Sequence, residues 1–479
     1  MTTIRRHPKA LPFLFLTEMW ERFGFYMVQG MLVLYMTKAY GFSDDQSYTV
    51  AGMFTSLAYI SAMAGGFIAD RLLGFKTSIV MGGIFLSLGY ALLSTLIPHL
   101  FYLGLATVIV GNGLFKPNIS SLLGALYEPG DSARDSGFTI FYIGINFGVL
   151  LSGASGTIQE YLGWHAVFGF ASVGLLVGLC TFAIGMKWGN MHNVTDHLLK
   201  NRSLFLRQPM IILYCLLTIG LLSFSLHSHL LGKWLLPTVG VFLLIFMFTL
   251  AFRQDKESCN QLITLNILII SSVVFWMLFW QIFFSANLFI DRIVDKHIFG
   301  IDMPTTWFYT LESIFIILLG PLFAWSWQTL NRSEKNPTPF SKFVVAIFCV
   351  GLGFLTLTIS TYYPTANHLV NPLWIVLSYL LITIGELLLS PIGLSAVTLL
   401  SPPRLTGLMM GIWFSSLGFG GQFGGLLAKM SSIPDTDKNV ISQLPIYRAA
   451  FLDYTLIAFG VVIVLFLLSI ILKKGMESR

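Results

Sequence analysis

Charged side chains are scarce in this chain: only 10% of its 479 residues are Asp, Glu, Lys or Arg, while 55% are hydrophobic. A soluble globular protein carries roughly 25% charged residues, because its surface faces water. This scarcity excludes a soluble enzyme and a disordered scaffold. With a mean hydropathy of +0.78, the composition indicates a polytopic membrane protein.

Cysteine is also rare, and its four residues are far apart with no CxxC spacing. That excludes a secreted disulfide module and indicates packing residues. The sequence contains no phosphate-binding GxxxxGKS loop, no metal-ligand cluster and no nucleophile–base pair, so we predict no enzyme activity, no cofactor, no metal and no ATP-driven transport by this chain alone. The net charge of +6 is thinly spread, which argues against nucleic-acid binding.

Long apolar runs, in contrast, are abundant. A membrane-spanning helix needs about 20 mostly apolar residues. Such runs predict an all-α fold with fourteen transmembrane helices. They lie near residues 11–37, 48–72, 77–96, 101–125, 137–160, 164–188, 209–228, 233–252, 262–290, 306–330, 341–362, 372–400, 405–430 and 447–473.

An even number of spans places both termini on one side, and most Lys and Arg residues fall in the loops of that side, so both termini are predicted to be cytoplasmic. Glycines and prolines of the first half also recur in the second half at one constant separation along the chain, so that Gly111 corresponds to Gly385 and Pro117 to Pro391. Unless these coincidences are chance, they predict two parallel six-helix halves with a substrate site between them, a transporter architecture. We expect one bundle at 1–188, a linker with an extra helix pair at 189–260, and a second bundle at 261–479.

Four charged residues of the first half lie inside predicted membrane helices, where ionisable groups are costly and mark functional sites. Glu18, Glu21 and Arg22 occupy the first helix, and Lys116 lies midway along the fourth. Two carboxylates and one guanidinium leave a negative charge that a proton or Lys116 must balance. The group predicts a proton switch, although a static ion network that only holds helices together would produce the same pattern.

The second half carries two deep carboxylates, Glu312 and Glu386, which we expect to face a cavity. Trp280 and Trp413 are large enough to line a ligand pocket, although aromatic residues of membrane helices mostly pack or anchor. After the second helix, a short charged loop at Asp70–Arg71 is expected to bind the end of a neighbouring helix and so to act as a conformational lock, stabilising one conformation of the protein.

Several motifs, in order along nearly the whole chain, resemble the proton-dependent oligopeptide transporter family of the major facilitator superfamily. The first helix contains Glu18-Met19-Trp20-Glu21-Arg22-Phe23-Gly24-Phe25-Tyr26, which is similar to the family pattern ExxERFxYY. Phe115-Lys116-Pro117-Asn118 is similar to its FKPN segment, and Gly385-Glu386-Leu387-Leu388 and Gly411-Ile412-Trp413-Phe414 resemble segments of its C-terminal half.

The resemblance implies the major facilitator fold, two six-helix bundles with an extra helix pair between them. It implies that Glu18, Glu21, Arg22 and Lys116 form a proton-coupling network. It also implies a peptide pocket lined by Tyr26, Tyr59, Tyr142, Asn146, Glu386 and Trp413.

Three positions depart from the family pattern. Gln29 stands where the family usually has an arginine, Glu312 stands where it has an amide, and no acidic residue is evident around Trp280 and Gln281 in the seventh helix of the family fold. Losing a cation and gaining an anion makes the pocket more negative. With Gln29, Trp280 and Glu312 added to the substrate-binding set, we therefore hypothesise a preference for positively charged substrates.

The function that follows is a proton-coupled symporter in a bacterial cytoplasmic membrane, importing di- and tripeptides or peptide-like amines by alternating access. Its expected partners are protons, the substrate and membrane lipid, and it is expected to work as a monomer. The alternative is a proton-coupled exporter of amines or drugs. A nutrient sensor or scaffold would typically need an appended soluble domain, and a membrane-embedded enzyme would need a catalytic constellation.

Overall fold

Nearly all of the described chain is helical, because a membrane interior offers no water to satisfy backbone N–H and C=O groups. The computed structural model describes residues 7–128, 131, 133–189, 191, 204–229, 231–298, 300–333, 337–434, 436–437 and 439–477. The chain divides into two units. Unit 1 comprises Met1–Tyr35 and Leu57–Leu230, and unit 2 comprises Met36–Ser56 and Leu231–Arg479.

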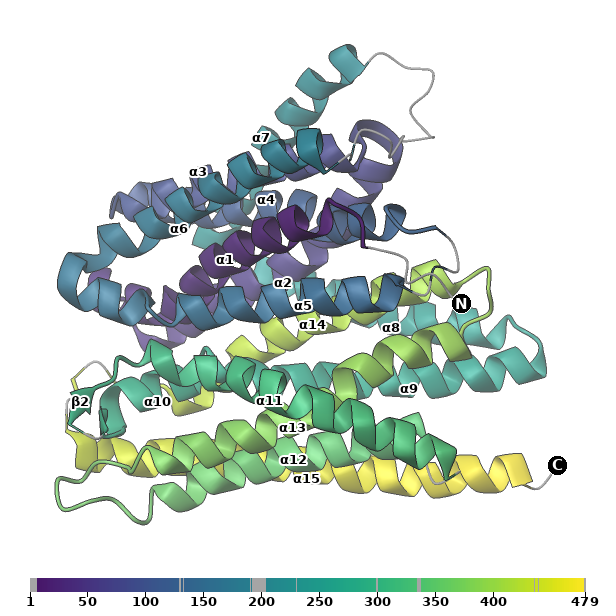
Figure 1. The fold of residues 1–479 in the computed structure, drawn as a ribbon. Coiled ribbons are helices and arrows are strands. Elements are labelled where there is room, and N and C mark those ends of the chain that lie inside the picture. Colours follow the sequence, from purple (N-terminus) through teal and green to yellow (C-terminus); the bar gives the residue numbers. More distant parts are fainter. Residues whose placement is uncertain are drawn as a thin grey trace. The chain divides into compact units, whose positions relative to one another are not determined.

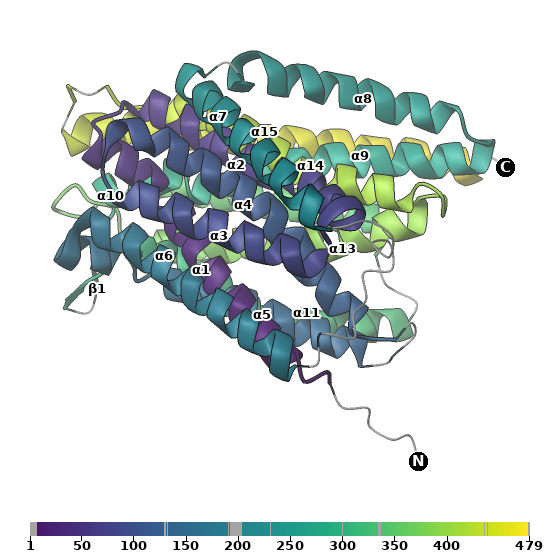
Figure 2. The same cartoon turned by 90° about the horizontal axis from the view of Figure 1, so that it is seen from above.

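In unit 1, α3 packs between α4 and α6 (Figure 2), and α7 packs on α4. The first two helices each contribute to both units, because the unit boundaries fall within them. The elements that lie wholly or partly in unit 1 are α1 (Leu11–Ala39), α2 (Asp44–Ile68), η1 (Ala69–Leu73), α3 (Phe75–Ser94), α4 (Pro98–Ala125), α5 (Arg134–Ser152), α6 (Ser155–Trp188) and α7 (Leu204–Ser228).

Glycines set the close approach of α3 and α4. A Cβ atom added to Gly82 would lie 2.7 Å from the carbonyl oxygen of Gly111, and one added to Gly111 would lie 2.8 Å from that of Gly82. No side chain fits at either position without moving backbone. Small residues at such contacts let membrane helices pack closely where no hydrophobic effect drives them together. The packing holds α4 in place, and α4 carries Lys116.

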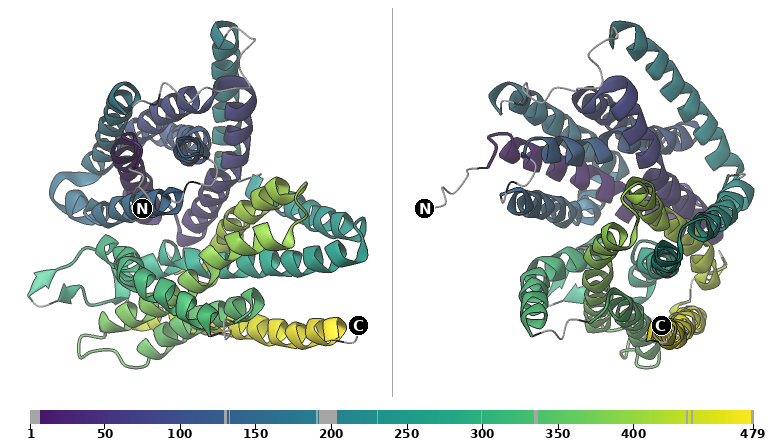
Figure 3. Two further views of the ribbon diagram at one scale, coloured as in Figure 1. Left: turned by 45° about the vertical axis from the view of Figure 1, so that its right-hand side comes forward. Right: turned by 90° about the vertical axis from the view of Figure 1, so that its right-hand side faces the viewer.

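In unit 2, α12 lies between α13 and α15 (Figure 1), and Figure 3 shows α15 in yellow beside the green helices of this unit. A short antiparallel hairpin precedes α11, with His297 opposite Asp302. The elements after residue 230 are η4 (Leu231–Leu235), α8 (Leu236–Phe252), α9 (Lys256–Phe279), η5 (Trp280–Ile282), α10 (Ser285–Ile293), β1 (His297–Ile298), β2 (Ile301–Asp302), α11 (Thr306–Arg332), α12 (Pro339–Ser360), α13 (Leu373–Leu400), α14 (Thr406–Ala428), η6 (Lys429–Ser431) and α15 (Val440–Glu477).

Each of the fourteen predicted spans coincides with a helix in the described part of the chain, which confirms the all-α membrane fold. Eleven of the described helical segments are long and apolar enough to cross a membrane, and α8 is a shorter apolar helix. The remaining two, α1 and α14, have the length but no stretch of comparable hydropathy: α1 contains Glu18, Glu21 and Arg22, and α14 is rich in glycine.

Two predicted spans are interrupted in the structure. The span at 137–160 contains the end of α5 at Ser152 and the start of α6 at Ser155, and Gly163 then kinks α6 with φ +81°. The span at 262–290 breaks after α9, where Phe284 leaves helical geometry with φ −108° and ψ −103°. The apolar run continues through both breaks, so hydropathy alone does not reveal them.

The extra helix pair is divided between the two units, with α7 in unit 1 and α8 in unit 2. Residues 190 and 192–203 of the predicted linker lie outside the described residues. The three-part division at 1–188, 189–260 and 261–479 stays a prediction.

Candidate functional site

Three ionisable residues of α1 meet in a buried group inside unit 1. Nη2 of Arg22 donates to Oε1 of Glu21 at 2.5 Å, and Nε of Arg22 donates to the other oxygen of the same carboxylate. Oε1 of Glu18 lies 3.5 Å from Nε of Arg22. All three side chains are at most 1% exposed. We call Glu18, Glu21, Arg22 and the nearby Lys116 the charge cluster.

Asn112 joins the charge cluster, and the sequence analysis missed it. Its side-chain oxygen accepts a hydrogen bond from Nη2 of Arg22 at 3.2 Å, and its nitrogen donates to the carbonyl of Ala58 at 2.7 Å. Asn112 lies one helical turn before Lys116 on α4, so the four-residue spacing already placed the two on one face. That spacing is the signal that could have found it.

The charge cluster is not fully paired. Oε2 of Glu18 and Nη1 of Arg22 are buried, and neither has a hydrogen-bond partner in the described part of the chain. Lys116 interacts electrostatically with Glu18, Glu21 and Arg22, yet among the described residues it forms no ion pair. The bidentate Glu21–Arg22 contact is thus the tight one, and Glu18 is the carboxyl held more loosely.

The predicted pocket residues of unit 1 lie on three helices. Gln29 on α1 and Asn146 on α5 are buried, and Asn146 donates to the carbonyl of Tyr142 at 3.0 Å. The Tyr142 side chain is 47% exposed. Tyr26 and Tyr59 are half-buried, and Tyr26 lies close enough to Arg22 to interact with it electrostatically. Their roles in substrate binding stay predictions.

Unit 2 brings Glu312 and Glu386 together. Glu312 lies on α11 and Glu386 on α13, two helices that pack against each other (Figure 1), and their carboxyl groups are within hydrogen-bonding reach. Glu312 is 7% exposed and Glu386 is half-buried. We call Glu312 and Glu386 the acid pair. The sequence indicated each residue separately, but no feature of the sequence indicated their contact.

The two predicted pocket tryptophans are buried within unit 2. The indole of Trp280 donates to the carbonyl of Leu417 at 3.1 Å. Trp413 packs against Gly393, where an added Cβ would collide with its ring, and edge-on against Phe343 at 6.0 Å between centroids. Gln281, the neighbour of Trp280 in η5, donates to the carbonyl of Gly424 at 2.9 Å and so joins η5 to α14.

The predicted conformational lock lies in η1 of unit 1. Asp70 and Arg71 are exposed, and neither forms an ion pair in the part of the chain that the structure describes. Gly74 ends this element with φ +78°, a conformation that favours glycine. Their role as a lock stays a prediction.

A set of ion pairs at one end of unit 2 was missed by the sequence analysis. Asp291 accepts from Lys38 at 2.7 Å and from the hydroxyl of Thr305 at 3.1 Å. Arg292 makes a bidentate contact with Asp44, with both distances 2.7 Å. These pairs join residues far apart in sequence, which single-sequence reasoning does not detect.

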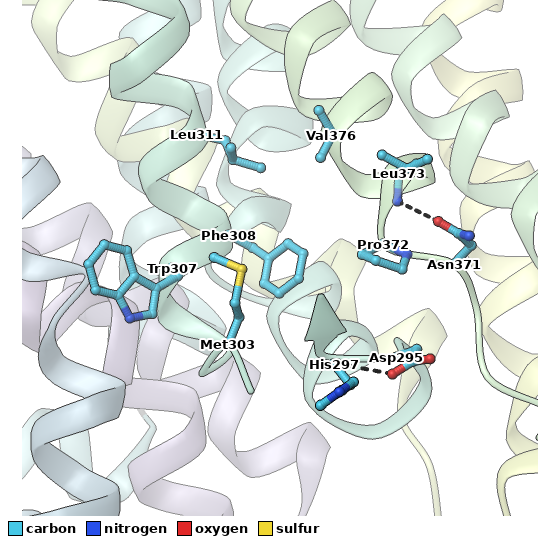
Figure 4. Close-up of a pocket in the computed structure, with 10 residues that line it drawn as sticks. All are labelled: Asp295, His297, Met303, Trp307, Phe308, Leu311, Asn371, Pro372, Leu373 and Val376. Carbon is cyan, nitrogen blue, oxygen red and sulfur yellow. Dashed lines mark hydrogen bonds between the residues drawn. The ribbon is translucent and has the colours of Figure 1, made fainter. Parts of the chain in front are cut away.

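A cavity of about 430 Å³ opens between the hairpin, α11 and α13 of unit 2 (Figure 4). Trp307, Phe308 and Leu311 of α11 line it opposite Leu373 and Val376 of α13. None of the residues singled out from the sequence is among its lining residues, so the acid pair is not part of this cavity.

The sequence profile of the POT family matches residues 76–444 of this chain. That match covers most of the chain and includes Lys116, Glu312 and Glu386. The chain belongs to the POT family. This confirms the family resemblance noted in its sequence, and the family and relatives of this POT family member are transporters, not enzymes.

Curated relatives of this POT family member include bacterial peptide transporters and permeases. "Dipeptide and tripeptide permease B" of Salmonella typhimurium is 34% identical over 469 residues, which cover 97% of this chain and 95% of that protein. "Peptide transporter YePEPT" of Yersinia enterocolitica is 34% identical over 450 residues, covering 88% of this chain and 87% of that protein.

Solved structures agree with the fold over almost the full length. A bacterial homologue of the human drug peptide transporters PepT1 and PepT2 superposes with a TM-score of 0.85 at 27% identity, covering 98% of this chain and 99% of that chain. A peptide transporter POT in complex with alafosfalin gives a TM-score of 0.80 at 30% identity, covering 96% and 95%. This POT family member is therefore a multi-span membrane transporter.

Proposed function

We propose that this POT family member is a proton-coupled symporter that imports di- and tripeptides or peptide-like amines across a bacterial inner membrane. The names of its relatives support a peptide substrate. The observation that carries proton coupling is the charge cluster, because ionisable groups inside a membrane protein are costly and are rarely retained without a function. A purely structural contact between helices would need no buried guanidinium, since apolar packing achieves it with less desolvation.

In this proposal Glu18 is the carboxyl that gains and loses the proton. Glu21 is already neutralised by its two hydrogen bonds from Arg22, whereas one oxygen of Glu18 has no donor in the described part of the chain. When Glu18 is protonated, its attraction to Lys116 disappears. When it is ionised, Lys116 is the cation free to approach it, and two such charges attract by about 4 kcal/mol at 4 Å with an effective dielectric constant of 20.

The direction of transport follows from the driving force. Moving one positive charge inward gains about 2.3 kcal/mol per 100 mV of membrane potential, and an acidic exterior adds to that gain. Protonation of Glu18 from outside would permit the conformational change that exposes the substrate to the cytoplasm. Deprotonation there would restore attraction to Lys116 and favour the return.

We further propose a preference for cationic substrates such as lysyl dipeptides. The predicted pocket lacks a cation at Gln29 and gains a carboxyl at Glu312, so its charge is more negative than the family pattern. An extra ammonium group on the substrate would compensate that charge.

Uptake into proteoliposomes tests the proposal. We expect labelled alanyl-alanine and alanyl-lysine to accumulate only with an inward proton gradient, with alanyl-lysine taken up faster. Equal accumulation of the dipeptides with and without the proton gradient would contradict proton coupling. Faster uptake of alanyl-alanine would contradict the charge preference.

A proton-coupled exporter of amines or drugs is the second candidate. A POT family transporter solved in complex with 5-aminolevulinic acid, with a TM-score of 0.82 at 25% identity, favours a site for small amines other than peptides. Reversing the proton gradient separates the two candidates, because an exporter would extrude a preloaded amine when the outside is acidic.

The remaining parts of the proposal are orientation and assembly. We propose that both termini face the cytoplasm, although residues 1–6 and 478–479 lie outside the described residues. We also propose a functional monomer. One relative of 27% identity was crystallised as a tetramer, so the mass of the detergent-solubilised protein by light scattering is the measurement that decides.

A further inference from the structure

The acid pair differs from the charge cluster in that, among the described residues, two carboxyl groups interact with each other and with no cation. An ionised carboxylate has only acceptor oxygens, so two ionised carboxylates cannot form a hydrogen bond with each other. Glu312 and Glu386 nevertheless lie within hydrogen-bonding reach. Two negative charges this close repel each other, so the arrangement favours a proton on one of the two carboxyls.

Unpaired polar atoms around the acid pair point the same way. Oε2 of Glu386 is buried, and no N–H or O–H donor of the described residues reaches it. Ser313, next to Glu312 and fully buried, lies near the Glu312 carboxyl without a well-aligned hydrogen bond. A buried acceptor left without a donor costs about 1–3 kcal/mol, and a proton held between the two carboxyls would remove that cost.

No cation of the described residues acts on the acid pair. The only charged group that acts on either carboxyl, among the described residues, is the other carboxyl. Helices α9, α12 and α14 pack against α13, together with α11. The other titratable or charged side chains on these helices are Tyr309, Arg332, Lys256, Glu257, Cys259, Lys342, Cys349 and Tyr379. Of the basic residues, Lys342 instead stacks on Trp327, 3.9 Å from its ring centroid.

We propose that Glu312 and Glu386 share a single proton and exchange it for the ammonium group of a cationic substrate. With one proton the pair carries one negative charge. An ammonium group has three N–H donors and can serve both carboxylates at once. Its binding releases the proton to solvent, and the site keeps one negative charge before and after, so the exchange adds no net charge to a buried site.

This inference rests on the proposed function only for the identity of the substrate, because the shared proton belongs to the protein alone. It assigns unit 2 a protonation site separate from the charge cluster of unit 1. It also explains why an additional carboxyl at position 312 is tolerated: the second carboxyl enters the membrane as a neutral acid.

Infrared spectroscopy of the purified full-length protein tests the shared proton without any substrate. We expect the carbonyl band of protonated carboxylic acid at pH 7 to lose the same single component in Glu312→Gln and in Glu386→Gln, because each variant removes the same proton. Glu257→Gln, an exposed glutamate of α9, is the matched control and should leave this band unchanged. A band unaltered in both acid-pair variants would overturn the shared proton.

Calorimetric titration with alanyl-lysine tests the exchange. In two buffers of different ionisation enthalpy, binding should release about one proton more from the wild type than from Glu312→Gln. Equal proton release in the two proteins would overturn the exchange. If alanyl-lysine does not bind while the infrared component is present, the exchange fails together with the proposed substrate, and the shared proton stands.

Discussion

The charge cluster of unit 1 and the acid pair of unit 2 both contain two glutamates, but the charges that surround these glutamates differ. In the charge cluster, two carboxylates face a guanidinium and a nearby ammonium, so cations of the protein itself compensate them. In the acid pair, the one charged group that acts on each carboxyl, among the described residues, is the other carboxyl. The first setting can remain ionised without a ligand. The second cannot, and it needs either a proton or a cation from outside.

This difference assigns the two centres different proposed tasks. The charge cluster can switch internally, because Lys116 supplies a counterion when Glu18 loses its proton. The acid pair has no cation as a partner among the described residues, so we propose that its protonation changes with what binds there. Coupling would then depend on the first centre and substrate charge selection on the second.

The largest expected effect comes from removing the cation of the charge cluster. Arg22→Met leaves Glu21 buried and unpaired, and breaking a buried ion pair in this way costs about 3–5 kcal/mol. We expect a marked fall in the apparent melting temperature in detergent. Glu312→Gln, which keeps a hydrogen bond in the acid pair, should melt close to the wild type. Arg71→Met, an exposed arginine of η1, is the control. If Arg22→Met melted like Arg71→Met, the charge cluster would not hold compensated charges.

The next effect concerns coupling. Lys116→Ala removes the counterion proposed for ionised Glu18, so gradient-driven uptake should fall at least about tenfold, the effect of about 1.4 kcal/mol. Exchange of labelled for unlabelled peptide without a gradient should persist, because it requires no return of the empty, deprotonated carrier. Uptake and exchange are measured in the same proteoliposomes. Equal loss of both activities would make Lys116 a structural residue and support the static ion network.

A smaller effect is expected on selectivity. Glu312→Asn restores the amide of the family pattern and removes one carboxyl of the acid pair. The uptake ratio of alanyl-lysine to alanyl-alanine should then fall by about tenfold, equivalent to about 1.4 kcal/mol. Competition between the two dipeptides in one assay measures the ratio directly, with Glu257→Asn as the matched control. An unchanged ratio would separate the acid pair from substrate charge.

The two centres also differ in how far sequence could predict them. Glu18, Glu21 and Arg22 lie within two turns of one helix, and helical spacing alone brings Glu18 and Arg22 onto one face. The contact between Glu312 and Glu386 depends instead on how α11 and α13 are rotated about their axes. Apolar residues occur on all faces of these two helices, so the hydropathy pattern does not indicate how the helices are rotated.

The same reasoning explains the fold. Long apolar runs predicted every membrane helix, because length and composition decide whether a segment spans a membrane. They did not predict the breaks at Ser152 and Phe284, since the sequence on both sides of each break is apolar. The pairs Lys38–Asp291 and Asp44–Arg292 were missed because they join residues brought together only by the folded chain.

The smallest expected effect tests whether the acid pair truly lacks a cation. Lys342 on α12 is buried and stacks on Trp327, and such a cation–π contact stabilises by about 0.5–2 kcal/mol. Lys342→Met keeps the apolar stem and removes the charge, so we expect a melting temperature slightly below that of the wild type. Because the charge of Lys342 does not act on Glu312 or Glu386, the carboxylic acid component assigned to the pair should stay unchanged in the infrared spectrum.

The control variant is Trp327→Phe, which weakens the stacking but keeps the ammonium group and should also lower the melting temperature. A change of the infrared component in Lys342→Met, but not in Trp327→Phe, would identify Lys342 as a counterion of the acid pair. The charge cluster and the acid pair would then be alike, because each would have a lysine as a counterion for its carboxyl groups.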